Sequence, residues 1–314
     1  MILDLDMTIL ITGGTGLVGK ALTNLFISKG YKVIILTRDV TNKADEPNIT
    51  YAAWNVEDGT IDKKAIETAD HIVHLAGENI AEKKWVKKRK IEIAQSRIKS
   101  SQLLVDSLIK IPNKVRSVIS ASAIGWYGED PEIPNRNPFS EEAPAAKGFL
   151  GETCKAWEAS ISPVQELGIR LVIVRTGIVF SKEGGAIAEF KKPLLRYGVA
   201  PILGSGKQAI SWIHEEDLAR LYLHAIENQN ISGVYNAVAT QITDNKRLNQ
   251  LLAKIYRKKF YMMMHVPGFI LKLVLGEMSV EVLKSTSVSN QKIRHTGFTF
   301  LYPAAETALK NLKT

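Results

Sequence analysis

The chain has 314 residues, 45% of them hydrophobic and 23% charged, and its formal net charge is +9 at pH 7. These proportions are ordinary for a globular enzyme with a large core, and no apolar run reaches membrane-spanning length, so we expect no membrane-spanning helix. The single Cys154 excludes an internal disulfide, no histidine or cysteine cluster has zinc spacing, and the acidic start lacks a signal peptide's basic region. We therefore expect a cytoplasmic protein with no metal site.

The first predicted element is an apolar strand that runs into a glycine-rich turn and then a helix. Gly13 permits the tight turn, Gly16 leaves room for a pyrophosphate, and Gly19 lets the helix pack closely on the sheet. The backbone N–H groups of the helix start then face the phosphates. This order of elements favours a dinucleotide site over a glycine-rich turn without a ligand. The predicted cofactor contacts here are Gly13, Thr15, Gly16, Leu17, Val18 and Gly19.

The end of the second predicted strand indicates which dinucleotide is bound. A carboxylate at this position favours NAD, whereas a cation accommodates the 2′-phosphate of NADP. Here the strand ends in Thr37 and Arg38, and a guanidinium can pair with phosphate through two hydrogen bonds. Asp39 follows one position late, and the alternative for Arg38 is an ordinary surface arginine. We predict NADP rather than NAD, with Asn55 at the third strand's end addressing the adenine edge.

The densest basic stretch spans residues 83–90 and includes Trp85. A tryptophan among cations could stack on a nucleic-acid base. The pattern is more typical of a solvated helix face with Trp85 tucked into the protein, so we do not expect nucleic-acid binding. The net positive charge instead favours a small-molecule partner that is anionic or linked to a nucleotide.

Strand and helix patterns alternate through the first half of the chain. Such alternation is typical of a Rossmann-type, doubly wound parallel sheet with helices on both faces and a ligand across the carboxyl ends of its strands. The predicted strands span residues 8–11, 32–37, 49–53, 71–75, 117–120 and 170–174, and the predicted helices span residues 17–29, 62–68, 83–109 and 150–167.

After Gly177 the pattern changes. Glycines and prolines over residues 181–210 indicate an excursion from the βα repeat, residues 215–227 a further helix and residues 234–236 a short strand. The remainder shows short helical patterns without a clear strand series. We predict an α/β chain with two units: residues 1–180 with 211–240 as the dinucleotide-binding domain, and residues 181–210 with 241–314 as a smaller, mostly helical substrate lobe.

Several motifs together carry a family resemblance. The turn at 12–19 resembles the TGxxGxxG fingerprint of extended short-chain dehydrogenase/reductases, and segments 74–77 and 120–128 resemble their fourth-strand and active-site serine motifs. More closely, the chain resembles the atypical nucleoside-diphosphate-sugar epimerase-like family of the YfcH type. The segments that carry this resemblance are residues 77–80, 96–97, 122–128, 154–158, 211–214 and 297–300.

The resemblance implies bound NADP, a C-terminal substrate lobe and a set of further cofactor contacts. Glu92 and Arg97 belong to this set, although an ordinary charge pair within the helix is an equal alternative. The residues that the resemblance assigns to the cofactor are Thr37, Arg38, Leu75, Ala76, Gly77, Glu92, Arg97, Arg175 and Thr176.

One departure from the larger superfamily concerns the reaction. That superfamily uses a Tyr-x-x-x-Lys pair, in which the lysine lowers the tyrosine pKa and the tyrosine moves a proton. Alignment on Glu158 puts Leu150 and Cys154 in these two positions, and Lys155 lies about 100° around the helix from the required direction. The usual pair is therefore absent.

Two hydroxyls remain as candidate catalytic groups. Ser122 keeps the position of a hydroxyl that contacts the reacting oxygen, and Tyr127 is a possible substitute acid; the alternatives are a serine that satisfies the strand end and a tyrosine that packs beside the pocket. Cys154 and His214 fit structural roles better. We predict an NADP-binding atypical dehydrogenase/reductase with epimerase-like or reductase activity, in which the substrate class includes nucleotide sugars. The alternative is a non-catalytic NADP-binding protein that senses redox state or regulates a partner.

Overall fold

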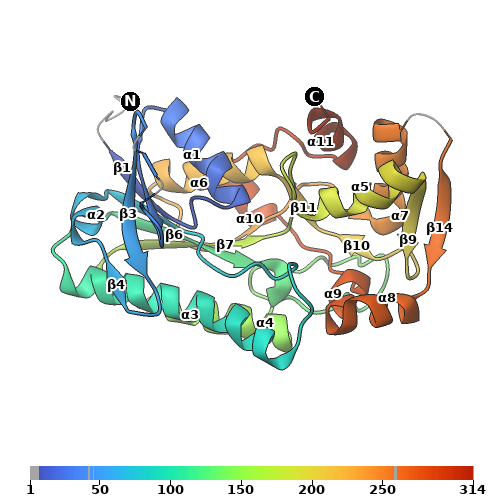
Figure 1. The fold of residues 1–314 in the computed structure, drawn as a ribbon, viewed down its shortest axis with the longest axis horizontal. Helices are drawn as coiled ribbons and strands as arrows, with labels where there is room; N and C mark the ends of the chain where they lie inside the picture. The colour runs from blue at the N-terminus through green and yellow to red at the C-terminus, as the bar shows by residue number, and fades with distance from the viewer. Residues whose placement is uncertain (1–6, 42, 45, 258–259, 314) are drawn as a thin grey trace.

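The computed structural model describes residues 7–41, 43, 44, 46–257 and 260–313. Its central layer is an eight-stranded sheet in the order β12-β7-β6-β5-β1-β2-β3-β4, parallel except for β4 (Figure 1). The predicted doubly wound sheet is thus confirmed, and the two-residue β4 was not predicted because it is too short to show a pattern. The strands are β1 (Thr8–Thr12), β2 (Lys32–Thr37), β3 (Ile49–Asn55), β4 (Thr60–Ile61), β5 (His71–His74), β6 (Ser117–Ala123), β7 (Arg170–Thr176) and β12 (Gly233–Ala237).

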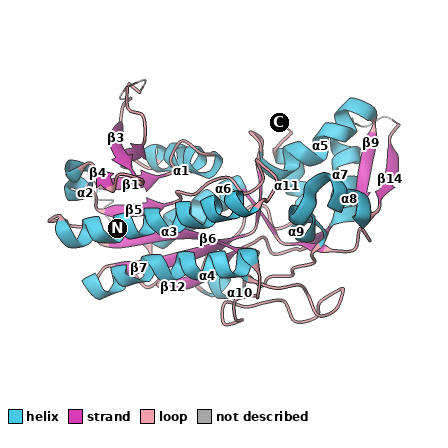
Figure 2. Ribbon diagram, turned by 60° about the horizontal axis from the view of Figure 1, so that its bottom comes forward, coloured by secondary structure: helices cyan, strands magenta, loops and turns pink. Residues whose placement is uncertain are grey.

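Helices cover both faces of this sheet (Figures 1 and 2). Because successive strand residues point to opposite faces, β1 serves both layers: Ile9 packs in the same core as Leu22 of α1, and Leu10 in the same core as Leu104 of α3. One layer contains α1 (Leu17–Ser28) and α6 (Glu215–Glu227), and the other contains α2 (Lys63–Thr68), α3 (Lys87–Lys110) and α4 (Phe149–Ile161).

Two predicted helices have different bounds in the structure. The helix predicted over residues 83–109 begins only at Lys87, because residues 78–86 form a loop between β5 and α3. The helix predicted over residues 150–167 ends as α4 at Ile161 and continues as the 3₁₀ helix η2 (Ser162–Leu167). Pro163 has no N–H to donate, so the α-helical hydrogen-bond ladder stops there.

A second, smaller unit packs beyond the carboxyl ends of β6 and β7 (Figure 2). Its core contains the stacked rings of Phe180 and Trp212, whose centroids are 4.5 Å apart. Helix α5 was not predicted, because glycines and Pro193 interrupt the helical pattern of its sequence. Strand β14, which pairs with β9, was not expected either. The elements of this unit are β8 (Ile178–Phe180), α5 (Gly185–Tyr197), β9 (Val199–Leu203), β10 (Ala209–Ile210), β11 (Trp212–His214), β13 (Thr243–Asp244), α7 (Asn245–Leu252), the π-helix η3 (Ala253–Arg257), β14 (Met262–Val266), α8 (Gly268–Leu275), η4 (Gly276–Met278), α9 (Ser279–Leu283) and α11 (Ala305–Asn311).

The chain returns to the sheet before it ends. Ile293 of α10 (Gln291–His295) and Phe298 are buried in the same core as Ile9 and Tyr222. We propose two units with the boundaries predicted above. This packing adds that residues near position 295 contribute to the core of the sheet domain. Within the described part of the chain, no helix has the length and apolar character that a membrane span requires.

Candidate cofactor site

The glycine-rich turn joins β1 to α1 through backbone geometry that side chains would obstruct. Gly13 has a φ of +70°, and a Cβ there would lie 3.1 Å from the carbonyl carbon of Leu75. A Cβ on Gly19 would overlap the Gly13 carbonyl oxygen and lie 2.5 Å from Gly14 Cα. Gly16 caps α1 without a side-chain hydrogen bond and the first turn holds no acidic residue, so the helix N–H groups stay available to an anion.

A hollow of about 820 Å³ opens in front of this turn. It is large enough for a drug-sized or nucleotide ligand. The ends of β1, β2, β3 and β5 form one side of it, and α3 forms the other. The predicted cofactor contacts that line it are Gly13, Thr15, Gly16, Thr37, Arg38, Asn55, Leu75, Ala76, Gly77 and Glu92.

At the predicted adenosine end, Arg38 is exposed on the rim of the hollow. The Oδ1 atom of Asp39 accepts hydrogen bonds from the amide and the hydroxyl of Thr41, at 2.9 and 2.5 Å. Since that carboxylate is engaged by its own turn, it leaves the anion-binding position to Arg38. The Asn55 side chain donates to Asp58 at 2.5 Å and accepts from the Glu57 amide at 3.0 Å, so its predicted contact with adenine requires this turn to open.

A buried relay beneath the turn connects it to α3. The Thr12 hydroxyl oxygen accepts from the amides of Leu75 and Ala76, at 3.0 and 3.1 Å, and lies 2.8 Å from His74 Nδ1. Because its oxygen already accepts two hydrogen bonds, the hydroxyl donates its proton to Nδ1, which places the single N–H proton of the neutral imidazole on Nε2. Nε2 lies 3.1 Å from the hydroxyl of Ser101 on α3. Sequence reasoning missed this role of Thr12 and His74, although His74 heads the quoted 74–77 motif.

Burial of His74 has a consequence for acid stability. Burial lowers the pKa of its imidazole from 6.5 to about 4, and burial does the same for His71. The unfolded chain therefore binds protons between pH 6.5 and 4 that the folded chain does not. We expect the free energy of unfolding to fall as the pH drops through this window, by up to about 1.4 kcal/mol per pH unit for each histidine.

Urea unfolding at several pH values measures this effect. A His74→Gln variant removes one histidine's share, so the stability gap between it and the parent protein should narrow from pH 6.5 to 4.5. A gap that stays constant across that range would show that His74 does not titrate as its burial requires.

The remaining predicted residues lie apart from the lining of the hollow. Leu17, Val18 and Gly19 form the first turn of α1, and Thr176 ends β7. Arg175 points into the protein, where its Nε and Nη2 donate to the two carboxylate oxygens of Glu158 at 2.8 and 2.9 Å. Its guanidinium carbon also lies 3.6 Å from the centre of the Trp126 ring.

The two predicted catalytic hydroxyls belong to the same buried network. Ser122 Oγ donates to Glu158 Oε1 at 2.6 Å, and the Tyr127 hydroxyl donates to Asn236 Oδ1 at 2.7 Å while it accepts from Arg175 at 3.1 Å. Tyr127 is 0% exposed, and burial raises its pKa. These contacts favour the packing role over the catalytic one for Tyr127. Glu158 at the centre of the network was missed, although it stands in the quoted 154–158 motif.

Two other side chains have the structural roles expected of them. Cys154 is buried with its sulfur 3.6 Å from the carbonyl oxygen of Ala123, and burial raises the pKa of its thiol to about 11. His214 caps α6, because its Nδ1 accepts from the Glu216 amide at 3.1 Å. Neither is therefore poised as a nucleophile or an acid.

Within the basic stretch Trp85 and Arg89 are buried, whereas the lysines at 83, 84, 87 and 88 are exposed. Arg89 is 5% exposed, and its Nη1 pairs with the carboxylates of Glu78 and Glu92 at 3.1 and 3.2 Å. The Trp85 indole donates to the Ile80 carbonyl at 2.7 Å, and its ring packs edge-on against Phe149. The expectation that Trp85 is tucked into the protein is thus confirmed, and this ring is not free to stack on a base.

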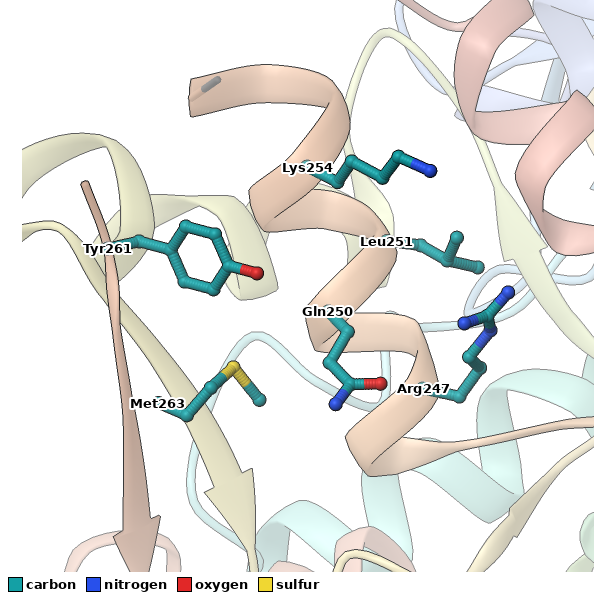
Figure 3. A pocket seen from close by; sticks show the side chains of 6 residues that line it. All are labelled: Arg247, Gln250, Leu251, Lys254, Tyr261 and Met263. Carbon is teal, nitrogen blue, oxygen red and sulfur yellow. The ribbon is translucent and has the colours of Figure 1, made fainter. Parts of the chain in front are cut away.

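A second hollow of about 350 Å³ lies in the smaller unit, between α7 and β14 (Figure 3). It contains none of the predicted site residues. Its lining consists of Arg247, Gln250, Leu251, Lys254, Tyr261 and Met263. Among the described residues, no group of three or more histidine, cysteine, aspartate or glutamate side chains is arranged to hold a metal.

Known proteins are similar to this chain over nearly its full length. Residues 9–237 match the NAD dependent epimerase/dehydratase family, and residues 266–312 match a domain of unknown function, DUF1731. The epimerase family protein YfhF of Bacillus subtilis is 33% identical over 98% of both chains, and that of Staphylococcus saprophyticus, SSP1921, is 34% identical over 96% of this chain and 98% of its own.

Two solved structures are similar to this chain in fold. The human epimerase family protein SDR39U1, crystallised with NADPH, has a TM-score of 0.81 and 26% identity over 98% of this chain and 99% of its own. The UDP-N-acetylglucosamine 4-epimerase from Bacillus cereus shares the fold, with a TM-score of 0.76 and 18% identity over 98% of both chains.

Proposed function

Since the chain belongs to the NAD dependent epimerase/dehydratase family, we propose that it binds NADP in the hollow before the glycine-rich turn and catalyses hydride transfer. The substrate of this proposal is a small molecule that is anionic or linked to a nucleotide. The observation that carries it is the hollow itself, where the open N-terminus of α1 meets Arg38 at the end of β2.

The residues of the hollow fit the proposed cofactor. A Cβ at Gly13 or Gly19 would collide with neighbouring backbone, so these glycines allow the tight turn that presents the open N-terminus of α1 to a pyrophosphate. Arg38 would hold the 2′-phosphate, and NADPH is the molecule with which the human relative was crystallised. A bound nicotinamide supplies or accepts hydride. Leu75, Ala76 and Gly77 would lie along the cofactor, while the first turn of α1, Glu92, Arg97, Arg175 and Thr176 complete the proposed set.

The proposed reaction also requires a group that transfers a proton. Ser122 and Tyr127 stay its candidates, and Ser122 would have to turn from Glu158 to reach a substrate oxygen. Both hydroxyls already donate hydrogen bonds to other side chains, and Leu150 and Cys154 stand in the positions of the usual pair. These two facts favour a second candidate function: an NADP-binding protein that senses redox state or regulates a partner without catalysis.

Binding and turnover separate the two functions. We expect NADPH to bind more tightly than NADH in a calorimetric titration, because only NADPH carries the 2′-phosphate. A panel of carbonyl compounds and nucleotide sugars, followed by NADPH absorbance, then tests for catalysis. Tight binding without oxidation across the panel would favour the regulatory function, and failure to bind either dinucleotide would contradict both.

The same assay on Tyr127→Phe decides between the two roles of that residue. A depressed rate with unchanged NADPH affinity would support the acid. An unchanged rate would assign Tyr127 to packing.

A further inference from the structure

Helix α8 turns an apolar face toward the solvent. Phe269 and Leu273 are 74% and 81% exposed, and the side chains at 270 and 274 are exposed beside them. Because residues four apart lie on the same side of a helix, these positions form one face, while Leu271 on the other side is buried. Helix α9 packs against α8 and extends the exposed surface. The α8 patch consists of Phe269, Ile270, Leu273, Val274 and Val280. Contiguous exposed apolar surface of this kind marks a contact with a protein or a membrane.

Lysines from two elements border the α8 patch. Lys272 is exposed on α8 itself, about 60° around the helix from Phe269. The start of α3 lies against η4, because Lys90 Nζ is 2.6 Å from the carboxylate of Glu277 (Figure 1). Lys87 is one turn before Lys90 and therefore on the same side of α3. The exposed lysines of this second segment are Lys83, Lys84, Lys87 and Lys88.

The carboxylates of the same two segments are already paired. Glu277 and Glu281 are the acidic residues between positions 260 and 284, and each has a lysine 2.6 Å away. The two glutamates of the loop before α3 lie 3.1 and 3.7 Å from the guanidinium of Arg89. The four exposed lysines of that segment, by contrast, form no ion pair within the described part of the chain. The border of the patch therefore carries an uncompensated positive charge.

We propose that the α8 patch and its lysines dock the protein on the surface of a bilayer that contains anionic lipids. An apolar helix face bordered by cations enters the headgroup region with its apolar side chains, while the lysines contact the lipid phosphates. A helix held in this way lies on the membrane and does not cross it. The docking surface goes beyond the proposed function and does not depend on which ligand binds in the hollow.

A second copy of this chain fits the same surface less well. Two copies joined symmetrically through the α8 patch would bring their lysine borders close together, and like charges across an interface oppose association. The formal net charge of +9 adds to that repulsion, whereas it adds attraction toward an anionic surface. The charge of the border therefore favours the lipid surface over the second copy.

Co-sedimentation with lipid vesicles tests the proposal. We expect the protein to bind vesicles of mixed phosphatidylcholine and phosphatidylglycerol about tenfold or more tightly than vesicles of phosphatidylcholine alone, and to bind them less as salt is added. Leu273→Glu should weaken binding to the mixed vesicles about tenfold or more, because a charge replaces an apolar side chain at the centre of the patch. Lys87→Gln combined with Lys88→Gln should weaken it about tenfold, through the loss of attraction to the anionic lipid.

Ile109→Glu is the matched control for Leu273→Glu. Ile109 is also exposed and apolar, but it lies at the far end of α3 from the patch, so this variant should bind vesicles as the parent does. Circular dichroism shows whether each variant is folded, and Val280→Glu on α9 repeats the test if Leu273→Glu is not.

Three results would overturn lipid docking. The first is no binding of the parent protein to the mixed vesicles, and the second is an equal loss of binding in Ile109→Glu and Leu273→Glu. The third comes from sedimentation equilibrium without lipid: a dimer that Leu273→Glu dissociates would assign the α8 patch to self-association instead.

Discussion

Replacing Arg38 with glutamate is expected to weaken NADPH binding roughly 100-fold and to change NADH binding much less. A charge-assisted hydrogen bond contributes about 1.5 to 3 kcal/mol, and reversing the charge adds repulsion to its loss. NADH has a hydroxyl where NADPH has the 2′-phosphate, so the substitution removes little from it. Calorimetric titration of both cofactors gives the ratio of the two losses.

The matched control is Lys29→Glu, which reverses an exposed charge that does not line the hollow. It should shift both affinities only slightly, and that of the more highly charged NADPH a little more, since only the overall field of the protein changes. Equal losses for NADPH and NADH in Arg38→Glu would contradict the phosphate role and return Arg38 to an ordinary surface residue.

Breaking the ion pair between Arg175 and Glu158 is expected to have the largest effect on stability. The two side chains are 3% and 9% exposed, so Arg175→Met leaves a carboxylate in the interior with Ser122 as its remaining donor. Removal of one partner of a buried pair costs about 3 to 5 kcal/mol. Urea unfolding at pH 7 measures this loss.

The double variant Arg175→Met with Glu158→Met is the control. It should recover much of the loss, because no uncompensated charge remains. A loss below about 1 kcal/mol in the single variant would mean that water or a ligand already reaches the pair. NADPH affinity in the folded single variant then shows whether Arg175 also contacts the cofactor.

The sheet could be predicted from the sequence because its strands are buried and appear as apolar runs. The glycine-rich turn could be predicted because Gly13, Gly16 and Gly19 act through the backbone, and backbone requirements leave a local mark. By contrast, Glu158 and Arg175 are 17 positions apart and Tyr127 and Asn236 are 109 apart, so no local pattern shows that these side chains meet. Residues 83–86 of the loop before α3 have lysines that suit a helix surface and therefore predict helix, whereas the loop's conformation depends on contacts of Arg89 with Glu78 and Asn79.

The late return of the chain to the sheet affects the order in which the protein can form during synthesis. Ile293 and Phe298 complete the core that α1 and α6 begin, and Ile293 is added after every strand of the sheet. Domains generally fold as units as they leave the ribosome, but here the layer that holds α1 stays incomplete until nearly the whole chain has emerged. A ribosome stalled near residue 240 would hold a nascent chain with this apolar surface uncovered, a substrate for chaperones rather than a finished cofactor domain.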